Sequence, residues 1–336
     1  MKKLTTKELV TFSQLVKLNQ PSLKKLVSNL LKNNYDKVIE TKHYVMAEGN
    51  IPIALVAHLD TVFISPPEEI YHDQNKNVMW SPDGLGADDR AGVYAIIKIL
   101  KSGYRPHIIF TTDEEKGGIG ASKLIKDYKE CPFKELKYMI ELDRRGTNDC
   151  VFYYCNNPQF VNYIEDYGFL ENFGTYSDIC EFGPAWGVAA VNLSIGYEDE
   201  HTCVERLFIS RMLNTISKVK KMLDDADTAP NFIYIETSVA EYYKNYYASF
   251  YGDNWKEYLM EDGYKCCNCG REYFDEELFP TLTEEGDTVR YCIDCLVAKN
   301  NIEWCELCNN PFEVPKGKNY KICPFCRSEE LGDNLK

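Results

Sequence analysis

The sequence predicts an α/β protein, a three-layer αβα sandwich with a mostly parallel central sheet, followed by a small cysteine-rich module. Short apolar runs bounded by turn residues alternate with amphipathic helical stretches, which is typical of strands covered by helices on both faces. The 336 residues are 44% hydrophobic and 27% charged, a composition that can enclose a large core. Nine of the fourteen cysteines lie within residues 266–336, so this segment is a separate module.

The expected elements follow in order along the first 225 residues. Apolar side chains recur at three- and four-residue steps over residues 5–33 and predict two helices divided by Pro21. The β-rich runs that follow are 42–49, 51–58, 107–112, 137–142, 151–155 and 188–195. The helical patterns between and after them are 91–101, 121–128, 158–167 and 207–223. A charged, breaker-rich stretch at 224–230 is expected to end the domain.

We therefore expect three parts, namely a catalytic α/β domain at 1–225, a Tyr-rich linker helix at 226–264 and the cysteine-rich module at 265–336. The segment 231–264 holds eight tyrosines. Its aromatic face is expected to pack on one domain, and the alternative is a surface for self-association or a partner.

Charge and hydropathy exclude several classes of protein. The formal net charge of −14 argues against binding of nucleic-acid phosphates as the main function. No stretch approaches the ~20 apolar residues that span a bilayer. The start, MKKLTTKELV, lacks the apolar segment of a secretory signal. We expect a cytoplasmic protein with reduced cysteines and no membrane contact.

Acidic and histidine side chains gather where strands end or a helix begins. They are His58, Asp60, Asp88, Asp89, Glu114, Glu115, Asp143 and His201. In open α/β sheets, ligands collect beyond the carboxyl ends of the strands, so we expect these residues to meet at one edge. Two imidazoles among several carboxylates form a mixed nitrogen and oxygen ligand set, which suits Zn²⁺ or a similar divalent ion.

Spacing adds detail to two of these pairs. Residues i and i+2 of a strand share a face, so Asp60 can accept a hydrogen bond from the second ring nitrogen of His58. The adjacent Glu114 and Glu115 point in different directions, so one can bind a metal while the other serves as the general base of a metal-assisted hydrolysis.

The motifs AHLDTV (57–62), LGADDRAG (85–92), FTTDEEKGGIGA (110–121), ELD (141–143) and NLSIGYEDEHTCVE (192–205) together resemble the di-zinc exopeptidase superfamily. Its members include peptidase T, carboxypeptidase G and acylase enzymes, and bacterial leucyl aminopeptidases. The resemblance covers about residues 5–223. It implies that His58 and Asp143 hold one zinc, that Glu115 and His201 hold the other, and that Asp88 bridges them. It also implies that Glu114 is the general base and that Asp60 orients His58. Cobalt or manganese stays open as the catalytic ion.

The sequence departs from this family pattern in two places. Only 57 residues separate Asp143 from His201, too few for an inserted lid domain, so the layout is closer to the lidless aminopeptidases. Asp143 is followed by Arg144 and Arg145, where small or neutral residues are expected. An arginine here could bind a substrate carboxylate, or neutralise the acidic site or form a surface ion pair.

Residues 176–178 fall where related enzymes carry a Thr-Asp or Ser-Asp segment near the active site. Tyr176 and Asp178 are therefore candidate substrate-binding residues, and the hydroxyl of Tyr176 could stabilise an oxyanion. The alternative is an ordinary turn.

Four CxxC pairs occupy the C-terminal module and predict two structural zinc sites, because two such pairs complete a four-thiolate site. The pairs are Cys266/Cys269, Cys292/Cys295, Cys305/Cys308 and Cys323/Cys326. They resemble zinc ribbons. Sequential pairing is preferred, and cross-braced pairing stays open. Residues 265–336 carry nine basic and fourteen acidic residues, which disfavours nucleic acid and favours a protein partner or self-association. A purely structural appendage is the alternative.

The sequence and its resemblance thus predict a metal-dependent hydrolase with two catalytic and two structural zinc ions. We expect a di-zinc aminopeptidase that cleaves short peptides. Two alternatives stay open. One is an N-acyl amino-acid amidohydrolase or carboxypeptidase on the same site, and the other is a non-catalytic, zinc-binding adaptor for protein interactions.

Overall fold

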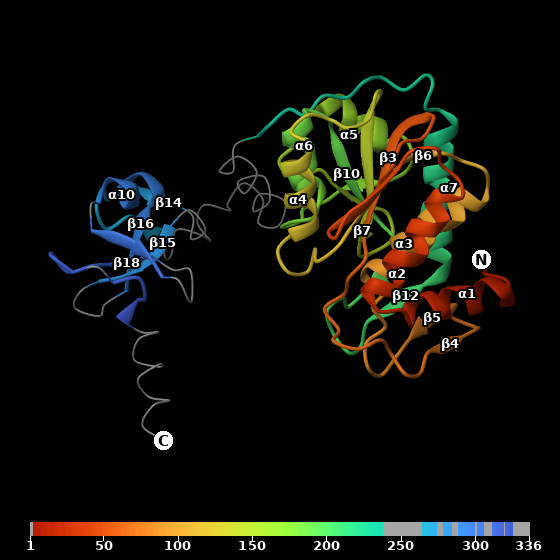
Figure 1. The fold of residues 1–336 in the computed structure, drawn as a ribbon, viewed down its shortest axis with the longest axis horizontal. Helices are drawn as coiled ribbons and strands as arrows, with labels where there is room; N and C mark the ends of the chain where they lie inside the picture. The colour runs from red at the N-terminus through yellow and green to blue at the C-terminus, as the bar shows by residue number, and fades with distance from the viewer. Residues whose placement is uncertain are drawn as a thin grey trace. The chain divides into compact units, whose positions relative to one another are not determined.

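The computed structural model describes residues 3–237, 264–273, 278–283, 288–299, 301–305, 311–318 and 320–324. The chain divides into two compact units, Met1–Val239 and Ala240–Lys336. The first unit contains an eight-stranded and a four-stranded sheet (Figure 1). The second contains a two-stranded and a four-stranded sheet. Among the helices of the described residues, none has the length and apolar character needed to cross a bilayer.

The first unit begins with the two expected helices, α1 (Thr6–Val16) and α2 (Gln20–Lys32). Thr5 caps α1 in a reciprocal capping box with Glu8, and the side chain of Asn19 caps α2. Pro21 lies in the first turn of α2, where its missing N–H leaves no hydrogen bond unmade.

The eight-stranded sheet has the order β1-β2-β6-β3-β7-β10-β8-β9. Its strands are β1 (Val38–Glu40), β2 (Tyr44–Ala47), β3 (Ile51–His58), β6 (Pro106–Thr111), β7 (Tyr138–Arg144), β8 (Asp149–Val151), β9 (Leu170–Glu171) and β10 (Ala190–Ser194). The four central strands, β6, β3, β7 and β10, are parallel, whereas β1, β2 and the β8–β10 pairing are antiparallel. The predicted mostly parallel sheet is confirmed.

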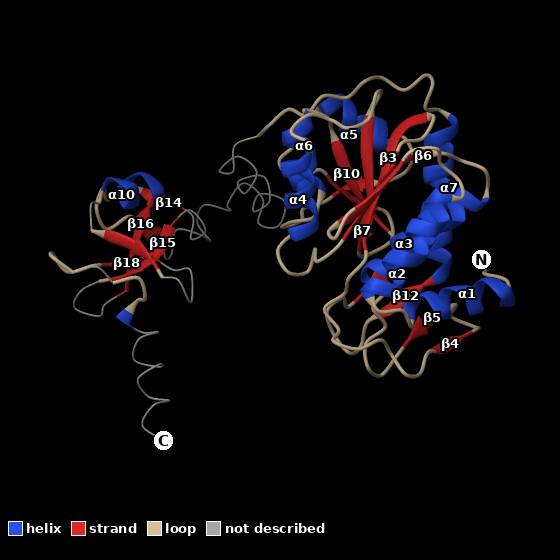
Figure 2. Cartoon of the chain, viewed as in Figure 1, coloured by secondary structure: helices blue, strands red, loops and turns tan. Residues whose placement is uncertain are grey.

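Helices cover both faces of this sheet (Figure 2). Along β3, Ile53, Leu55 and Ala57 belong to one core cluster with side chains of α1, α2, α3 (Ala87–Lys101), α5 (Pro158–Glu165) and α7 (Ile209–Asp224). Ala54 and Val56 belong to a second cluster with α4 (Ile119–Asp127) and α6 (Ile179–Trp186). Because alternate residues of a strand face opposite sides, each face of the sheet has its own core. The predicted three-layer αβα architecture is confirmed.

Some elements differ from the expected ones. The run 151–155 is strand only at its first residue, and α6 has no counterpart among the expected helices. Short strands also form a second sheet of the first unit, in the order β11-β12-β5-β4. They are β4 (Tyr71–Asp73), β5 (Val78–Trp80), β11 (Tyr197–Glu198) and β12 (Arg206–Phe208). Because β12 takes residues 206–208, α7 begins at Ile209.

Residues 226–237, which we expected to begin the linker, pack on the first unit. Phe232 is 4% exposed, and isolated bridges join Ile233 to Val188 and Glu236 to Cys155. The remainder of the expected linker, 238–263, lies outside the described residues.

The second unit is built from short strands and one described helix. Its elements are β13 (Tyr264–Lys265), β14 (Glu272–Tyr273), β15 (Leu278–Leu282), β16 (Thr288–Cys292), α10 (Ile293–Ala298), β17 (Ile302–Trp304) and β18 (Pro311–Glu313). Strands β13 and β14 pair with each other, and the other four form a sheet in the order β16-β15-β18-β17.

Candidate active site

The predicted acidic and histidine residues meet at the carboxyl edge of the central strands. A pocket of about 330 Å³ lies there, and its lining includes Asp88, Glu114, Glu115, Asp143 and His201. Strands β3, β6 and β7 supply residues at or just beyond their ends, while α3 supplies one near its start. The parallel arrangement of the strands therefore brings together side chains that are far apart in the sequence.

His58 is the last residue of β3 and is fully buried between carboxylates. Its Nδ1 lies 3.3 Å from Asp60 Oδ1, and its Nε2 lies 2.9 Å from Asp88 Oδ1 and 3.4 Å from Asp143 Oδ1. Asp60 thus fixes one ring nitrogen, and Nε2 is the nitrogen available to a metal ion.

Asp60 also organises the two glutamates that follow β6. Its Oδ1 accepts a hydrogen bond from the backbone N–H of Glu114 at 3.0 Å, and its Oδ2 accepts one from Glu115 at 3.1 Å. One buried carboxylate therefore positions a histidine and both glutamates, beyond the role expected from the sequence.

Asp88 lies between the two histidines. Its Oδ1 faces His58, and its Oδ2 lies 3.2 Å from Nε2 of His201. Gly86, with φ +67°, starts the turn that delivers Asp88, in a backbone conformation that an L side chain rarely adopts. His201 Nε2 is also 3.0 Å from Glu115 Oε2. Each oxygen of Asp88 thus faces a different histidine.

Asp143 is held by neighbours from three other segments. Tyr197 donates its hydroxyl to Asp143 Oδ1 at 3.0 Å, and Ser177 donates to Oδ2 at 3.2 Å. The side chain of Asn192 accepts from the Asp143 backbone N–H at 2.9 Å and donates to its carbonyl oxygen at 2.8 Å. These bonds fix both the backbone and the carboxylate of Asp143.

The electrostatics of the site favour a bound cation. Burial raises the pKa of Glu114 to about 9, and the carboxylate of Asp143 adds to the shift. Burial and the charge of Asp88 raise the pKa of Glu115 to about 7 and that of Asp143 to about 6. The carboxylates therefore oppose one another's ionisation, and positive charge among them would favour the ionised forms.

The donor atoms also form groups that could hold metal ions. His58, Asp88 and Asp143 form one group whose donor atoms lie within 4.8 Å of one another. Asp88, Glu115 and His201 form a second group on the same criterion. The two groups share Asp88. Mixed imidazole and carboxylate donors, with Asp60 beside Nδ1 of His58, fit zinc or a similar transition metal.

A comparison with protein families finds a match in this part of the chain. Residues 40–170 match the model of peptidase family M28. The first unit is a metallopeptidase domain. The match contains His58, Asp88, both glutamates and Asp143, and it confirms the resemblance to the di-zinc exopeptidases. No curated protein matches the sequence of the chain.

Solved structures share the fold of the peptidase domain. An aminopeptidase PepT from Bacillus cereus is 14% identical, with a TM-score of 0.52 over 66% of this chain and 98% of that one. A tripeptidase from Staphylococcus aureus is 15% identical, with a TM-score of 0.51 over 66% and 97%. A TET aminopeptidase from a marine-sediment archaeon of the Thaumarchaeota is 14% identical, with a TM-score of 0.50 over 65% and 96%.

The expected substrate-binding residues of the peptidase domain have different positions. Arg144 and Tyr176 line the pocket. Arg145 lines it too, and its Nη1 pairs with Glu200 Oε1 at 2.9 Å. Asp178 is fully buried at the start of α6 and accepts a hydrogen bond from Thr111, so it does not reach the pocket.

Glu205 is a residue of the peptidase domain for which no role was expected from the sequence. It is fully buried, and its carboxylate accepts hydrogen bonds from the backbone N–H groups of Gly86, Ala87 and Asp88. Glu205 is four residues after His201 and ends the motif NLSIGYEDEHTCVE (192–205). That position was the sequence signal that could have identified it.

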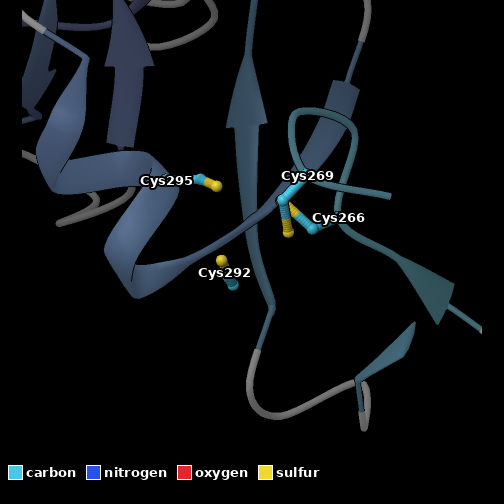
Figure 3. A group of neighbouring side chains, drawn as sticks. All are labelled: Cys266, Cys269, Cys292 and Cys295. Carbon is cyan, nitrogen blue, oxygen red and sulfur yellow. The ribbon is translucent and has the colours of Figure 1, made fainter. Parts of the chain in front are cut away.

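In the second unit, the first two CxxC pairs come together. Figure 3 shows the sulfur atoms of Cys266, Cys269, Cys292 and Cys295 facing a common point, and they lie within 4.8 Å of one another. Burial opposes ionisation of Cys266, but the backbone N–H groups of Cys269, Cys292 and Asn268 outweigh it and lower its pKa to about 6. This thiol is therefore poised to bind a metal as a thiolate.

The other two pairs are only partly described. The backbone N–H of Cys323 donates to Cys305 Sγ at 3.3 Å, and both residues are buried. The predicted ligands Cys308 and Cys326 lie outside the described residues.

Proposed function

We propose that the chain is a di-metal aminopeptidase that removes residues from short peptides. The position of Asp88 carries the proposal, because its two oxygens face two histidines while Glu114 and Glu115 lie beside them. Peptidases of family M28 depend on zinc. In our assignment His58 and Asp143 hold one ion, Glu115 and His201 hold the other, and Asp88 contacts both.

Ions held in this way supply Lewis acidity to a carbonyl oxygen and to water. The side chains of the protein position the reacting groups and move the proton. Glu114 takes a proton onto its carboxylate from the attacking water and returns it to the leaving amine. Asp60 orients His58 and both glutamates, and Tyr176 offers a hydroxyl at the pocket wall.

Two observations favour aminopeptidase action. The segment between Asp143 and His201 is occupied by β8, α5, β9, α6, β10 and β11, all part of the domain's own fold, which leaves the layout of a lidless enzyme. The similar structures include an aminopeptidase and a tripeptidase by name. A set of tripeptides with free, N-acetylated or C-amidated ends tests the direction of cleavage. We expect hydrolysis to require the free amine, and a requirement for the free carboxylate alone would overturn this part of the proposal.

The variant Glu114→Gln tests the mechanism. It keeps the size of the side chain but removes the proton acceptor, so we expect kcat to fall about 10²- to 10⁴-fold with unchanged metal content. Metal content is measured by mass spectrometry of the purified protein, and kcat with the preferred tripeptide. Lys116→Gln, an exposed neighbour in the same loop, is the control. Retained turnover in the Glu114 variant would contradict the assignment.

We further propose that the second unit binds two structural zinc ions. Cys266, Cys269, Cys292 and Cys295 hold one, which corresponds to sequential pairing. The close contact of Cys305 and Cys323 supports the second. The acidic balance of residues 265–336 supports a protein partner or self-association as the role of this module.

A further inference from the structure

We propose that Arg144 makes the pocket selective for substrates with a carboxylate next to the scissile bond. This inference rests on the proposed function, because it concerns the substrate of the same site. Arg144 is the last residue of β7 and directly follows Asp143. It lines the same pocket as Asp88, Glu114, Glu115 and His201. A group that binds there lies beside the atoms proposed to do the chemistry.

The hydrogen bonds of Arg144 leave most of its guanidinium unused. A guanidinium carries five N–H donors in a planar fork. Nη2 of Arg144 donates to the carbonyl oxygen of Phe173 at 2.9 Å. Its Nε is buried and has no hydrogen-bond partner. Among the described residues, no carboxylate forms an ion pair with Arg144. The N–H donors that Phe173 does not use are therefore available to an anionic ligand.

Arg145 provides the contrast within the same pocket wall. Its Nη1 lies 2.9 Å from Oε1 of Glu200, and its side chain is 58% exposed. The charge of Arg145 is therefore already balanced by the protein. Of the two neighbouring arginines, Arg144 is the one left to pair with a ligand.

Gly174 lies beside the guanidinium of Arg144. A Cβ atom at Gly174 would lie 3.1 Å from the ring of Tyr153 and 3.5 Å from Nη1 of Arg144. Because Gly174 has no side chain, no side-chain atom of this residue lies against Nη1 of Arg144. The pocket, at about 330 Å³, is at the small end of the range for ligand sites. It suits one or two residues of substrate.

The charge of the pocket shows why an arginine would be needed. Asp88, Glu114, Glu115 and Asp143 all line it, so a substrate carboxylate would meet like charges in the pocket. A planar guanidinium binds a carboxylate through two parallel hydrogen bonds and offsets that repulsion. The carboxylate can belong to an acidic side chain at the first residue of the substrate, or it can be the terminal carboxylate of a dipeptide.

Two pairs of substrates distinguish these sources. Glutamyl and glutaminyl p-nitroanilides differ only in side-chain charge, and Ala-Ala and Ala-Ala-amide differ only at the C-terminus. We expect the wild-type enzyme to prefer the carboxylate member of one pair. In Arg144→Met, the ratio of kcat/KM values within that pair should fall about 10- to 100-fold. Arg145→Met is the matched control and should keep the ratio. Metal content is measured in all three proteins.

A binding measurement keeps the test independent of turnover. Calorimetric titration of the metal-loaded wild type with glutamate, glutamine, alanine and alaninamide should show tighter binding of one carboxylate form, and Arg144→Met should lose that difference. If the wild type hydrolyses both members of each pair equally, the inference is overturned while the proposed function stands. If no substrate is hydrolysed, the proposed function fails, and Arg144-dependent binding of a carboxylate still supports the inference. Equal loss of preference in both arginine variants would overturn the assignment to Arg144.

Discussion

Glu205 fixes the backbone that carries Asp88, the proposed shared ligand. Its carboxylate accepts hydrogen bonds from the N–H groups of Ala87 at 3.1 Å and Asp88 at 3.0 Å, and from Gly86. Burial raises its pKa to about 7, although these three donors oppose the shift. Residues that position metal ligands in this way affect metal affinity without touching the metal.

We expect Glu205→Gln to weaken metal binding about 10- to 100-fold, because an amide cannot satisfy three converging N–H groups as a carboxylate does. The free energy of unfolding should also fall by about 1–3 kcal/mol. Metal affinity is measured by competition with a chromogenic chelator, and stability by urea unfolding.

Glu198→Gln is the control for this variant, since Glu198 pairs with Arg211 and is not among the residues lining the pocket. It should bind metal as the wild type does. Equal metal affinity in both variants and the wild type would show that Glu205 does not position Asp88.

At the scale of elements, α3 and β7 approach each other closely behind the site. A Cβ atom on Gly92 would lie 2.3 Å from the carbonyl oxygen of Leu142 and 2.4 Å from Oδ1 of Asp89. Leu142 directly precedes Asp143, and Asp89 directly follows Asp88. The glycine therefore sets the spacing between the two elements that carry Asp88 and Asp143.

The variant Gly92→Ala should be destabilised by about 1–3 kcal/mol, because the methyl group meets backbone atoms that cannot rotate away. The stability lost through this clash should exceed the stability gained because alanine has a higher helix propensity than glycine, which is about 1 kcal/mol. Urea unfolding gives the stability, and Lys101→Ala on the exposed last turn of α3 is the control. A variant as stable as the wild type would mean that α3 can move away from β7 without loss of stability.

The periodic pattern of apolar residues predicts the long buried helices and strands, and it fails for the short ones. The expected strand 51–58 coincides with β3, because eight consecutive residues bounded by turns give a clear pattern. The strands of the sheet β11-β12-β5-β4 are two or three residues long and show no period. Helix α6 contains Gly183 and Pro184, which have low helix propensity, and it forms where Phe182 and Trp186 pack into a core cluster.

The site was more predictable than its supporting residues. His58, Asp88, Glu115, Asp143 and His201 belong to motifs whose residue types point to metal chemistry, and the structure brings them together. Tyr197, Asn192 and Glu205 support them through hydrogen bonds from other segments. These contacts depend on three-dimensional packing, and a single sequence holds no periodic signal for them.

At the scale of the whole molecule, the two kinds of proposed metal site occupy separate units. The nitrogen and oxygen donors lie in the first unit and the four described thiol ligands in the second. Each set of proposed ligands comes from one unit only. The two kinds of site should therefore bind and lose their metal ions independently of each other.

Metal analysis of the full chain should give about four zinc ions, two for each kind of site. Cys292→Ser removes a thiolate from the second unit, so the count should fall to about three while kcat/KM for a tripeptide stays unchanged. Cys267→Ser, which alters a cysteine outside the cluster, is the control. A loss of kcat/KM in the Cys292 variant alone would show that the two units are coupled.

The order of the strands in the central sheet has a consequence for the synthesis of the protein. The proposed donors of the site run from His58 in β3 to His201, which follows β10 in the sequence, and β10 pairs with β7 in the sheet. A nascent chain emerges from the ribosome with His58 first and His201 last. A chain that ends before β10 lacks His201, so we expect such a fragment to have no peptidase activity.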